Sequence, residues 1–268
     1  MITVVAVTGL ATVQDAGRPG HMHEGVPPGG PLVPELLARA NAAVGNEALT
    51  AGLELFGAVT LVGPPGTVVA CDDGAAVTLE VGASWRADCA GRRVRYVAVR
   101  GGVDVPRVLG GRGTLLGAAV GGLEGRALRS GDPLRVGEAA PGSRRVVAPA
   151  APDLDAPIRV VPGPDLDRLT PEALRVLLGS EFRVDPASDR VGIRLAGPLL
   201  GRMAADTGAS SPMVRGAIQV PPSGAPIVLG PDHPTTGGYP VLAVVARSSL
   251  GSLGARPIGA AVRFVASP

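Results

Sequence analysis

The sequence GLELFG at residues 52–57 alternates apolar side chains with other residues between two glycines, a pattern typical of a β-strand followed by a tight turn. The sequence GIRLAG at residues 192–197 has the same form. Two further pairs of segments match in the same order, residues 2–5 with 158–161 and residues 128–136 with 256–264. Three ordered matches favour an internal duplication. We therefore expect two similar β units.

Composition supports this expectation. The 268 residues include 46% hydrophobic residues, 40 Gly and 27 Pro, which suits short strands joined by tight turns better than long helices. The segment at 137–157 is rich in Ala and Pro and has no sustained period, so it is interpreted as a linker. We predict an N-terminal β-barrel unit at residues 1–139, a linker at 140–156 and a C-terminal β-barrel unit at 157–268.

Each unit is expected to carry one or two short helices. Pro34 starts a helix that ends at Val44, with Gly45 as its C-terminal cap. Thr170 is expected to cap a second helix that runs from Pro171 to Gly179. Besides the N-terminal segment and the two segments quoted above, we expect strands at Thr67–Cys71, Ala76–Val81, Val94–Val99, Ile227–Leu229 and Val241–Ala246.

The composition also excludes several kinds of chemistry. The chain has no lysine, so it cannot form a Schiff base, carry covalent biotin or supply a P-loop lysine. The net charge of +2 with interspersed signs, and the absence of an Arg-rich run, argue against nucleic-acid binding. No apolar stretch approaches the length of a membrane span, and the N-terminus has no signal-like pattern. We expect a cytoplasmic protein that binds neither membrane nor nucleic acid.

Standard catalytic and metal-binding signatures are absent. The sequence contains no GxSxG, GxxxxGK[ST] or HExxH motif, and Cys71 and Cys89 suggest neither a disulfide framework nor a zinc site. His21 and His23 lie beside Glu24, but two histidines make a poor closed metal site. We predict no metal here. Ordinary loop residues or contacts to a substrate remain the two alternatives for these histidines.

Two polar segments of the N-terminal half are candidates for a site. Residues 12–18 place Asp15 and Arg18 in a glycine turn, which is either held by an internal contact or faces a cleft. Arg100 ends a buried strand beside two glycines and Asp104. An Arg next to exposed backbone N–H groups could hold a carboxylate or phosphate, and a structural ion pair is the alternative.

The densest polar segment spans residues 216–240, where two turns flank a strand. Its second turn contains Asp232 and the run Thr-Thr-Gly-Gly-Tyr at 235–239. Glycines allow close backbone approach to a ligand, while Thr and Tyr supply oriented donors. This pattern favours a ligand site over a simple turn.

At these residues the chain resembles the biotin-dependent carboxyltransferase A/B-like proteins, a family that includes the C subunit of 5-oxoprolinase, allophanate hydrolase subunit 2 and part of urea carboxylase. The similar segments are TVQDAGRPGH, GVPPGG, LARANAAVGN, YVAVRGGVDVPRVLG, GRALRSGD, RVVPGP, SDRVGIRLAGP, GAIQVPPSGAPIVLG and TTGGYP. The resemblance implies two cyclophilin-like β-barrel units. It also implies a paired, B-like subunit related to a kinase-inhibitor protein and, in the 5-oxoprolinase case, a third, lactam-opening subunit.

The polar and glycine positions that the resemblance carries over form the predicted site. As catalytic residues we predict Asp15, Arg100, Asp232 and Thr236. As substrate-binding residues we predict Arg18, Asp104, Arg190, Gln219, Thr235, Gly237, Gly238 and Tyr239. Ser188 and Asp189 also match family motifs. The chain departs from the family pattern at Gly29-Gly30-Pro31, Val33 and Pro234, where relatives usually have polar groups.

The resemblance implies that the chain belongs to an ATP-dependent complex that converts 5-oxoproline to glutamate, and that it is inactive alone. In that interpretation an Arg (Arg100 or Arg190) holds a carboxylate, the 236–238 backbone stabilises developing negative charge, and an Asp handles protons. ATP would be used by the complex, since this chain has no P-loop, and biotin only if another chain carried it. The alternatives are a carboxyltransferase or allophanate/urea amide-processing subunit, and a regulatory antagonist of a histidine-kinase inhibitor.

Overall fold

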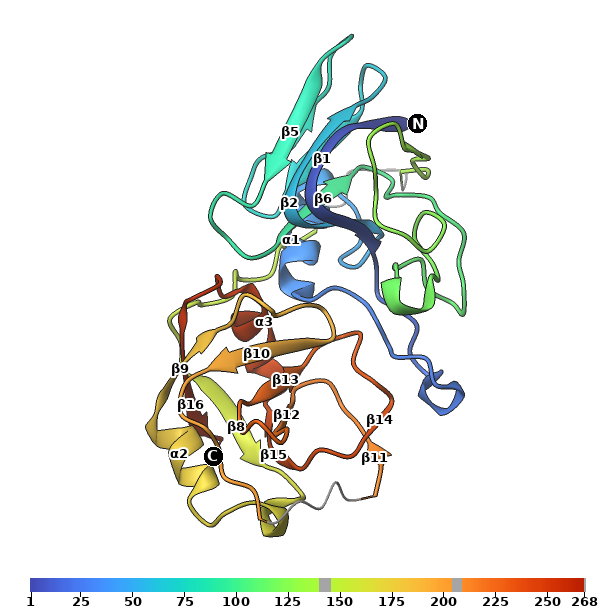
Figure 1. The fold of residues 1–268 in the computed structure, drawn as a ribbon. Coiled ribbons are helices and arrows are strands. Elements are labelled where there is room, and N and C mark those ends of the chain that lie inside the picture. The colour runs from blue at the N-terminus through green and yellow to red at the C-terminus, as the bar shows by residue number, and fades with distance from the viewer. Residues whose placement is uncertain (140–145, 204–208, 268) are drawn as a thin grey trace. The chain divides into compact units, whose positions relative to one another are not determined.

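The computed structural model describes residues 1–139, 146–203 and 209–267, which form two compact units (Figure 1). Unit 1 comprises Met1–Pro19 and Gly29–Pro152, and unit 2 comprises Gly20–Pro28 and Asp153–Pro268. The sequence-based boundaries at residues 139 and 157 stay a prediction about folding domains. Residues 140–145 of the predicted linker lie outside the described residues.

Unit 1 is built on an antiparallel sheet with the strand order β4-β3-β6-β2-β1-β7, and β5 pairs with β2 (Figure 1). The strands are β1 (Ile2–Gln14), β2 (Gly52–Val62), β3 (Val68–Cys71), β4 (Val77–Thr78), β5 (Ser84–Asp88), β6 (Arg95–Val99) and β7 (Pro133–Leu134). The strand expected at 76–81 is therefore only two residues long. Gly9 faces Gly57 across the β1–β2 ladder. A Cβ on Gly57 would lie 1.9 Å from the Thr8 carbonyl oxygen, so the long ladder needs glycine there.

Helix α1 (Pro34–Val44) begins and ends where the sequence predicted. Pro34 occupies the first turn, and Gly45 ends the helix with φ of 80°, a left-handed conformation that favours glycine. The helix packs against β3 and β6. Its buried residues include Leu37 and Val44. It therefore closes one side of the unit 1 core, which is made mainly of Val, Leu, Ala and Ile side chains.

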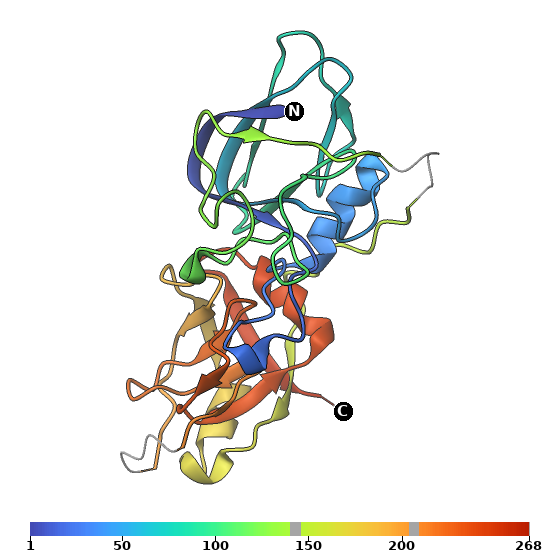
Figure 2. The same ribbon diagram turned by 90° about the vertical axis from the view of Figure 1, so that its right-hand side faces the viewer.

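Among the described residues, unit 2 forms a closed barrel with the order β10-β13-β12-β15-β8-β16-β9, in which β9 also pairs with β10 (strands labelled in Figure 1). Figure 2 shows the same ribbon after a 90° turn. Its strands are β8 (Ile158–Pro162), β9 (Glu181–Val184), β10 (Gly192–Ala196), β12 (Ala217–Gln219), β13 (Ile227–Leu229), β15 (Val241–Val245) and β16 (Ala261–Ala266). A separate ribbon pairs β11 (Ser211–Pro212) with β14 (Thr236–Gly237). The expected mainly β fold and the barrel are thus confirmed, while the proposed duplication stays a prediction.

The helices of unit 2 depart from expectation. Helix α2 (Ala173–Gly179) starts two residues after Pro171, because the Thr170 carbonyl accepts the N–H of Ala173 and Glu172 takes the N-terminal cap position. Helix α3 (Arg247–Ala255), which packs against β8, was not predicted. Short 3-10 turns occupy Met22–Glu24 (η1), Leu116–Ala118 (η2) and Leu166–Arg168 (η3). In the described part of the chain, no helix is long and apolar enough to cross a membrane.

Candidate functional site

Unit 1 contains a cleft of about 600 Å³ where several loops meet beside the carboxyl ends of β1 and β6. Two of the predicted site residues, Asp15 and Asp104, line it. The other walls come from residues 47–51, which precede β2, and from the segment containing Arg107 and Arg112. Segments that the sequence analysis singled out separately are therefore adjacent in the fold.

The Asp15 carboxylate organises one wall of this cleft. Its Oδ1 accepts hydrogen bonds from the backbone N–H of Gly17 at 2.9 Å and of Gly113 at 3.0 Å. Its Oδ2 accepts the N–H of Arg112 at 2.7 Å. A carboxylate holding three backbone donors fixes the turn after β1 against residues 112–113. This geometry favours a positioning role for Asp15 over proton transfer, the role predicted from the sequence.

Arg18 is buried rather than exposed to a ligand, with 1% of its surface accessible. Its guanidinium donates to the carbonyl oxygens of Gly113 and Val108. Arg18 and Asp15 therefore both attach the first turn to the 108–113 segment, one through carbonyls and the other through N–H groups. The proposed substrate contact of Arg18 stays a prediction.

The turn after β6 uses its glycines for backbone geometry. Gly101 and Gly102 have φ of 90° and 76°, and a Cβ on Gly101 would lie 2.1 Å from the Gly137 carbonyl oxygen. The Gly101 N–H donates to Asn46 Oδ1 at 2.8 Å, and the Gly102 N–H donates to the Val99 carbonyl. These N–H groups are already satisfied, so they do not form the anion site that the sequence suggested.

The charged residues of this turn have different partners. The exposed Arg100 directs Nε to the Val44 carbonyl at the end of α1, at 3.1 Å. Arg100 is not among the residues that line the cleft. Asp104 forms an ion pair with Arg112 at 3.0 Å on the cleft wall. The structure therefore brings Asp104 to the cleft while Arg100 supports the end of a helix.

Two charged cleft residues were missed by the sequence analysis. Glu47 and Arg107 are exposed and line the cleft, and neither side chain forms a hydrogen bond or ion pair within the described residues. Arg107 lies in the resembling segment YVAVRGGVDVPRVLG, which was the available signal. A guanidinium without an internal partner retains all its donors for a carboxylate or phosphate.

In unit 2, Arg190 and Asp232 form a bidentate ion pair, with both N–O distances at 2.8 Å. Their side chains are 5% and 7% exposed. The two residues are also joined through the backbone, because the Asp232 N–H donates to the Arg190 carbonyl. The predicted substrate and proton-transfer roles of this pair stay predictions, and the geometry is that of a buried structural link.

The segment from Thr235 to Tyr239 is a structured ribbon. Thr236 and Gly237 pair with β11, and the Gly238 carbonyl accepts a hydrogen bond from Arg168 at 2.8 Å. Gly237 and Gly238 do not adopt positive φ. The absence of a side chain at these two positions therefore serves to let other groups come close to the backbone. Tyr239 is 41% exposed.

The remaining predicted residues of unit 2 support loops. The buried Gln219 places Nε2 3.0 Å from the Met213 sulfur, beside Gly237. Ser188 exchanges hydrogen bonds with the Arg194 backbone, and Asp189 Oδ1 accepts two backbone N–H groups. The predicted proximity of the 235–239 loop to the Arg100 segment stays a prediction, because these lie in different units.

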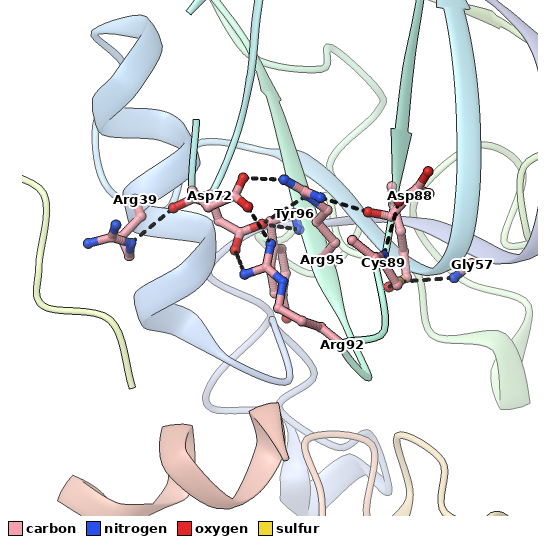
Figure 3. Close-up of polar contacts among 11 residues, drawn as sticks. Arg39, Gly57, Asp72, Asp88, Cys89, Arg92, Arg95 and Tyr96 are labelled. Carbon is pink, nitrogen blue, oxygen red and sulfur yellow. Dashed lines mark hydrogen bonds and ion pairs between the residues drawn. The ribbon is translucent and has the colours of Figure 1, made fainter. Parts of the chain in front are cut away.

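Unit 1 also contains a polar network that the sequence analysis did not find (Figure 3). Asp72, fully buried at its side chain, accepts the Tyr96 N–H at 3.0 Å and pairs with Arg92 at 2.7 Å. Arg95 pairs with Asp73 and donates to the Asp88 carbonyl. Burial raises the pKa of the nearby Cys71 thiol to about 11. These contacts tie β5 and β6 to the end of β3, and they create no reactive thiolate.

The histidine pair forms only local contacts. His21 Nδ1 lies 2.9 Å from Glu24 Oε2, and His23 lies 3.5 Å from the same carboxylate group. Within residues 1–139, 146–203 and 209–267, no group of three His, Cys, Asp or Glu residues is arranged to hold a metal ion.

Comparisons with known proteins agree on one family. The model of the carboxyltransferase domain, subdomain A and B, matches residues 86–266. The chain is 33% identical over 287 residues to the C subunit of 5-oxoprolinase from Escherichia coli, covering 99% of this chain and 91% of that protein. It is 29% identical to urea amidolyase of Saccharomyces cerevisiae, covering 95% of this chain and 16% of that protein. The solved urea amidolyase of K. lactis superposes with a TM-score of 0.87 at 26% identity, over 100% of this chain and 19% of that one.

Proposed function

Since this chain belongs to the carboxyltransferase domain family, subdomain A and B, we propose that it works within an ATP-dependent 5-oxoprolinase complex that converts 5-oxoproline to glutamate. The observation that carries the proposal is the 33% identity to the C subunit of 5-oxoprolinase, which extends over nearly the full length of both chains. The chain has neither a P-loop nor lysine, so an ATP step depends on other groups of this chain or on another chain. The partners expected are a paired, B-like subunit related to a kinase inhibitor and a lactam-opening third subunit.

The unit 1 cleft is the site we assign to the substrate. 5-Oxoproline carries one carboxylate, and Arg107 is a cleft guanidinium whose donors are not used by the described residues. Glu47 supplies an exposed carboxylate in the same cleft, suited to accept a hydrogen bond from the lactam N–H. Asp15 and the Asp104–Arg112 pair hold the walls around these two groups.

The complex reconstituted from its subunits tests the proposal. ATP hydrolysis and glutamate release are measured with 5-oxoproline, urea and allophanate in turn, and again with each subunit alone. We expect turnover with 5-oxoproline only, and none from this chain by itself. Stimulation by urea or allophanate instead of 5-oxoproline would contradict the assignment.

Variants of the cleft test its role within that complex. Arg107→Gln removes one charge-assisted contact, so kcat/KM for 5-oxoproline should fall roughly tenfold to a hundredfold, mainly through KM. Arg86→Gln is the matched control, because Arg86 is 58% exposed on β5 and lies outside the cleft lining. An unchanged KM for 5-oxoproline in the Arg107→Gln variant would contradict the assignment of the cleft as the substrate site.

A second function follows from the urea amidolyase similarity. In that case the chain works as a carboxyltransferase unit for urea-derived substrates, with biotin carried on another chain because this one has no acceptor lysine. Urea-dependent ATP hydrolysis that requires a biotin carrier would favour this function over the first.

A further inference from the structure

Unit 2 contains a second cavity, of about 560 Å³, to which the Arg190–Asp232 pair does not contribute. It is bounded by three segments: residues 154–157 before β8, Glu181 at the start of β9, and residues 256–263 between α3 and β16. Leu154, two prolines and two alanines supply apolar surface. None of the predicted site residues lines it.

One cavity wall contains a buried arginine. Arg256 is 3% exposed, and its guanidinium donates to the carbonyl oxygens of Ala156 and Ala261. Its Nε has no hydrogen-bond partner. A guanidinium has five N–H donors, so two bonds to carbonyls leave part of this group unsatisfied in a buried position. The Nε itself has almost no accessible surface, so a ligand in the cavity can use only the N–H donors of the two terminal nitrogens that the carbonyls leave unused.

The charge of Arg256 also lacks a close counter-ion. Within the described residues it forms no ion pair, although it is more than nine-tenths buried. Burial lowers the pKa of its guanidinium, and the carboxylates of Asp155 and Asp153 oppose this shift from farther away. Its place directly after α3 gives partial compensation, because the carboxyl end of a helix is negative.

The other charged residues that line the cavity determine which kind of ligand it can bind. Glu181 is engaged by Arg183 and Arg263, each at 3.0 Å. Asp155 is exposed, lines the cavity, and its carboxylate forms no ion pair within the described residues. The cavity thus presents a buried cation, a separate anion and apolar surface together.

We propose that this cavity binds a small zwitterion of the amino-acid class, with its carboxylate on Arg256, its ammonium group facing Asp155 and an aliphatic side chain against Leu154 and the prolines. The carboxylate supplies the counter-charge that Arg256 lacks. A doubly charged anion such as phosphate fits less well, because the Asp155 carboxylate, which forms no ion pair within the described residues, repels it. This site lies within unit 2 and is independent of the proposed 5-oxoproline cleft in unit 1.

Three probes that share one carbon skeleton test the proposal on the full chain: L-leucine, 4-methylpentanoate, which lacks the amine, and 3-methylbutylamine, which lacks the carboxylate. Binding is followed by chemical-shift changes of the Ala260 and Ala261 amides in ¹⁵N NMR spectra. We expect L-leucine to bind with a Kd on the order of 1 mM, 4-methylpentanoate about threefold to fivefold more weakly, and the amine not at all. No shift with L-leucine, or equal binding of the amine, would overturn the proposal.

Variants separate the two charged contacts. Asp155 is exposed, so the Asp155→Asn variant should fold normally. This variant should bind L-leucine about threefold to fivefold more weakly and should bind 4-methylpentanoate as before. Arg256→Lys keeps the positive charge but loses the planar set of N–H donors of the guanidinium, so L-leucine and 4-methylpentanoate should both bind roughly tenfold more weakly. Arg194→Gln, on the exposed face of β10, is the control and should bind as the unmodified chain does. Should Asp155→Asn leave L-leucine binding unchanged, the zwitterion assignment is wrong whatever the fate of the Arg256 variant.

Discussion

Replacing Asp15 by alanine tests whether this residue organises the cleft or transfers protons. The carboxylate accepts three backbone N–H groups, at 2.7, 2.9 and 3.0 Å. The side chain is partly exposed, so each bond is assigned about 1 kcal/mol, below the range for fully buried charged acceptors. The variant should therefore lose about 3 kcal/mol of unfolding free energy, which corresponds to a fall in Tm of roughly 6–12 °C.

The assay is urea and thermal unfolding followed by circular dichroism, with Asp104→Ala as the control. Asp104 lines the same cleft, but it is exposed and its ion pair with Arg112 contributes less than about 1 kcal/mol. An Asp15→Ala variant within about 0.5 kcal/mol of the unmodified chain would refute the structural role. A large loss of kcat in the complex with unchanged stability would instead restore the proton-transfer role.

Three further predictions concern unit 2, and a fourth concerns the thiol of Cys71 in unit 1. Burial lowers the pKa of His233 below its ordinary value of 6.5, so the contribution of His233 to stability should be constant above about pH 6.5 and fall as the pH drops from there to the folded-state pKa. His233→Gln should remove this part of the pH dependence of unfolding. Arg190→Met removes the bidentate, buried guanidinium from Asp232 and should cost about 3–5 kcal/mol, whereas Arg190→Met with Asp232→Leu should recover much of it, as measured by urea unfolding. Cys71, with a pKa of about 11, is about one part in a thousand thiolate at pH 8, so iodoacetamide should alkylate the native chain far more slowly than the unfolded chain, as followed by mass spectrometry. Tyr239→Phe removes the hydroxyl of a side chain that is 41% exposed and should change stability by less than about 0.5 kcal/mol, so a loss of activity in the complex at unchanged stability would indicate a ligand contact.

The parts of the fold that the sequence predicted are those where local chemistry decides the structure. Helix α1 has proline in its first turn and glycine at its end, and both bounds were predicted correctly. Helix α3 has the sequence RSSLGSLGA, in which Ser and Gly disfavour a helix. Most of its residues are buried, so packing overrides this weak propensity. Closure of the barrel depends on β9 pairing with both β10 and β16, which no local pattern indicates.

The candidate site also has features that the sequence predicted and features that only the fold shows. Asp15 and Asp104 were predicted from their glycine turns, and the structure places both on one cleft. The pairing of Arg190 with Asp232 spans distant segments, so the sequence offered both residues as ligand contacts without showing that each is held by the other. Arg107 lies in a segment that resembles the family, but the sequence does not show that its side chain lines the same cleft as Asp15.

The arginines show why the sequence alone does not separate structural residues from ligand-binding ones. The chain has no lysine, so every cation with a structural task and every cation with a ligand to bind is the same residue type. The guanidinium of Arg18 is used by backbone carbonyls, whereas that of Arg107 forms no bond within the described residues. Arg256 lies between these cases, since it is buried and bonded but still has an unsatisfied Nε. Counting which donors of each guanidinium are already used therefore separates structural arginines from ligand-binding ones, and that count requires the fold.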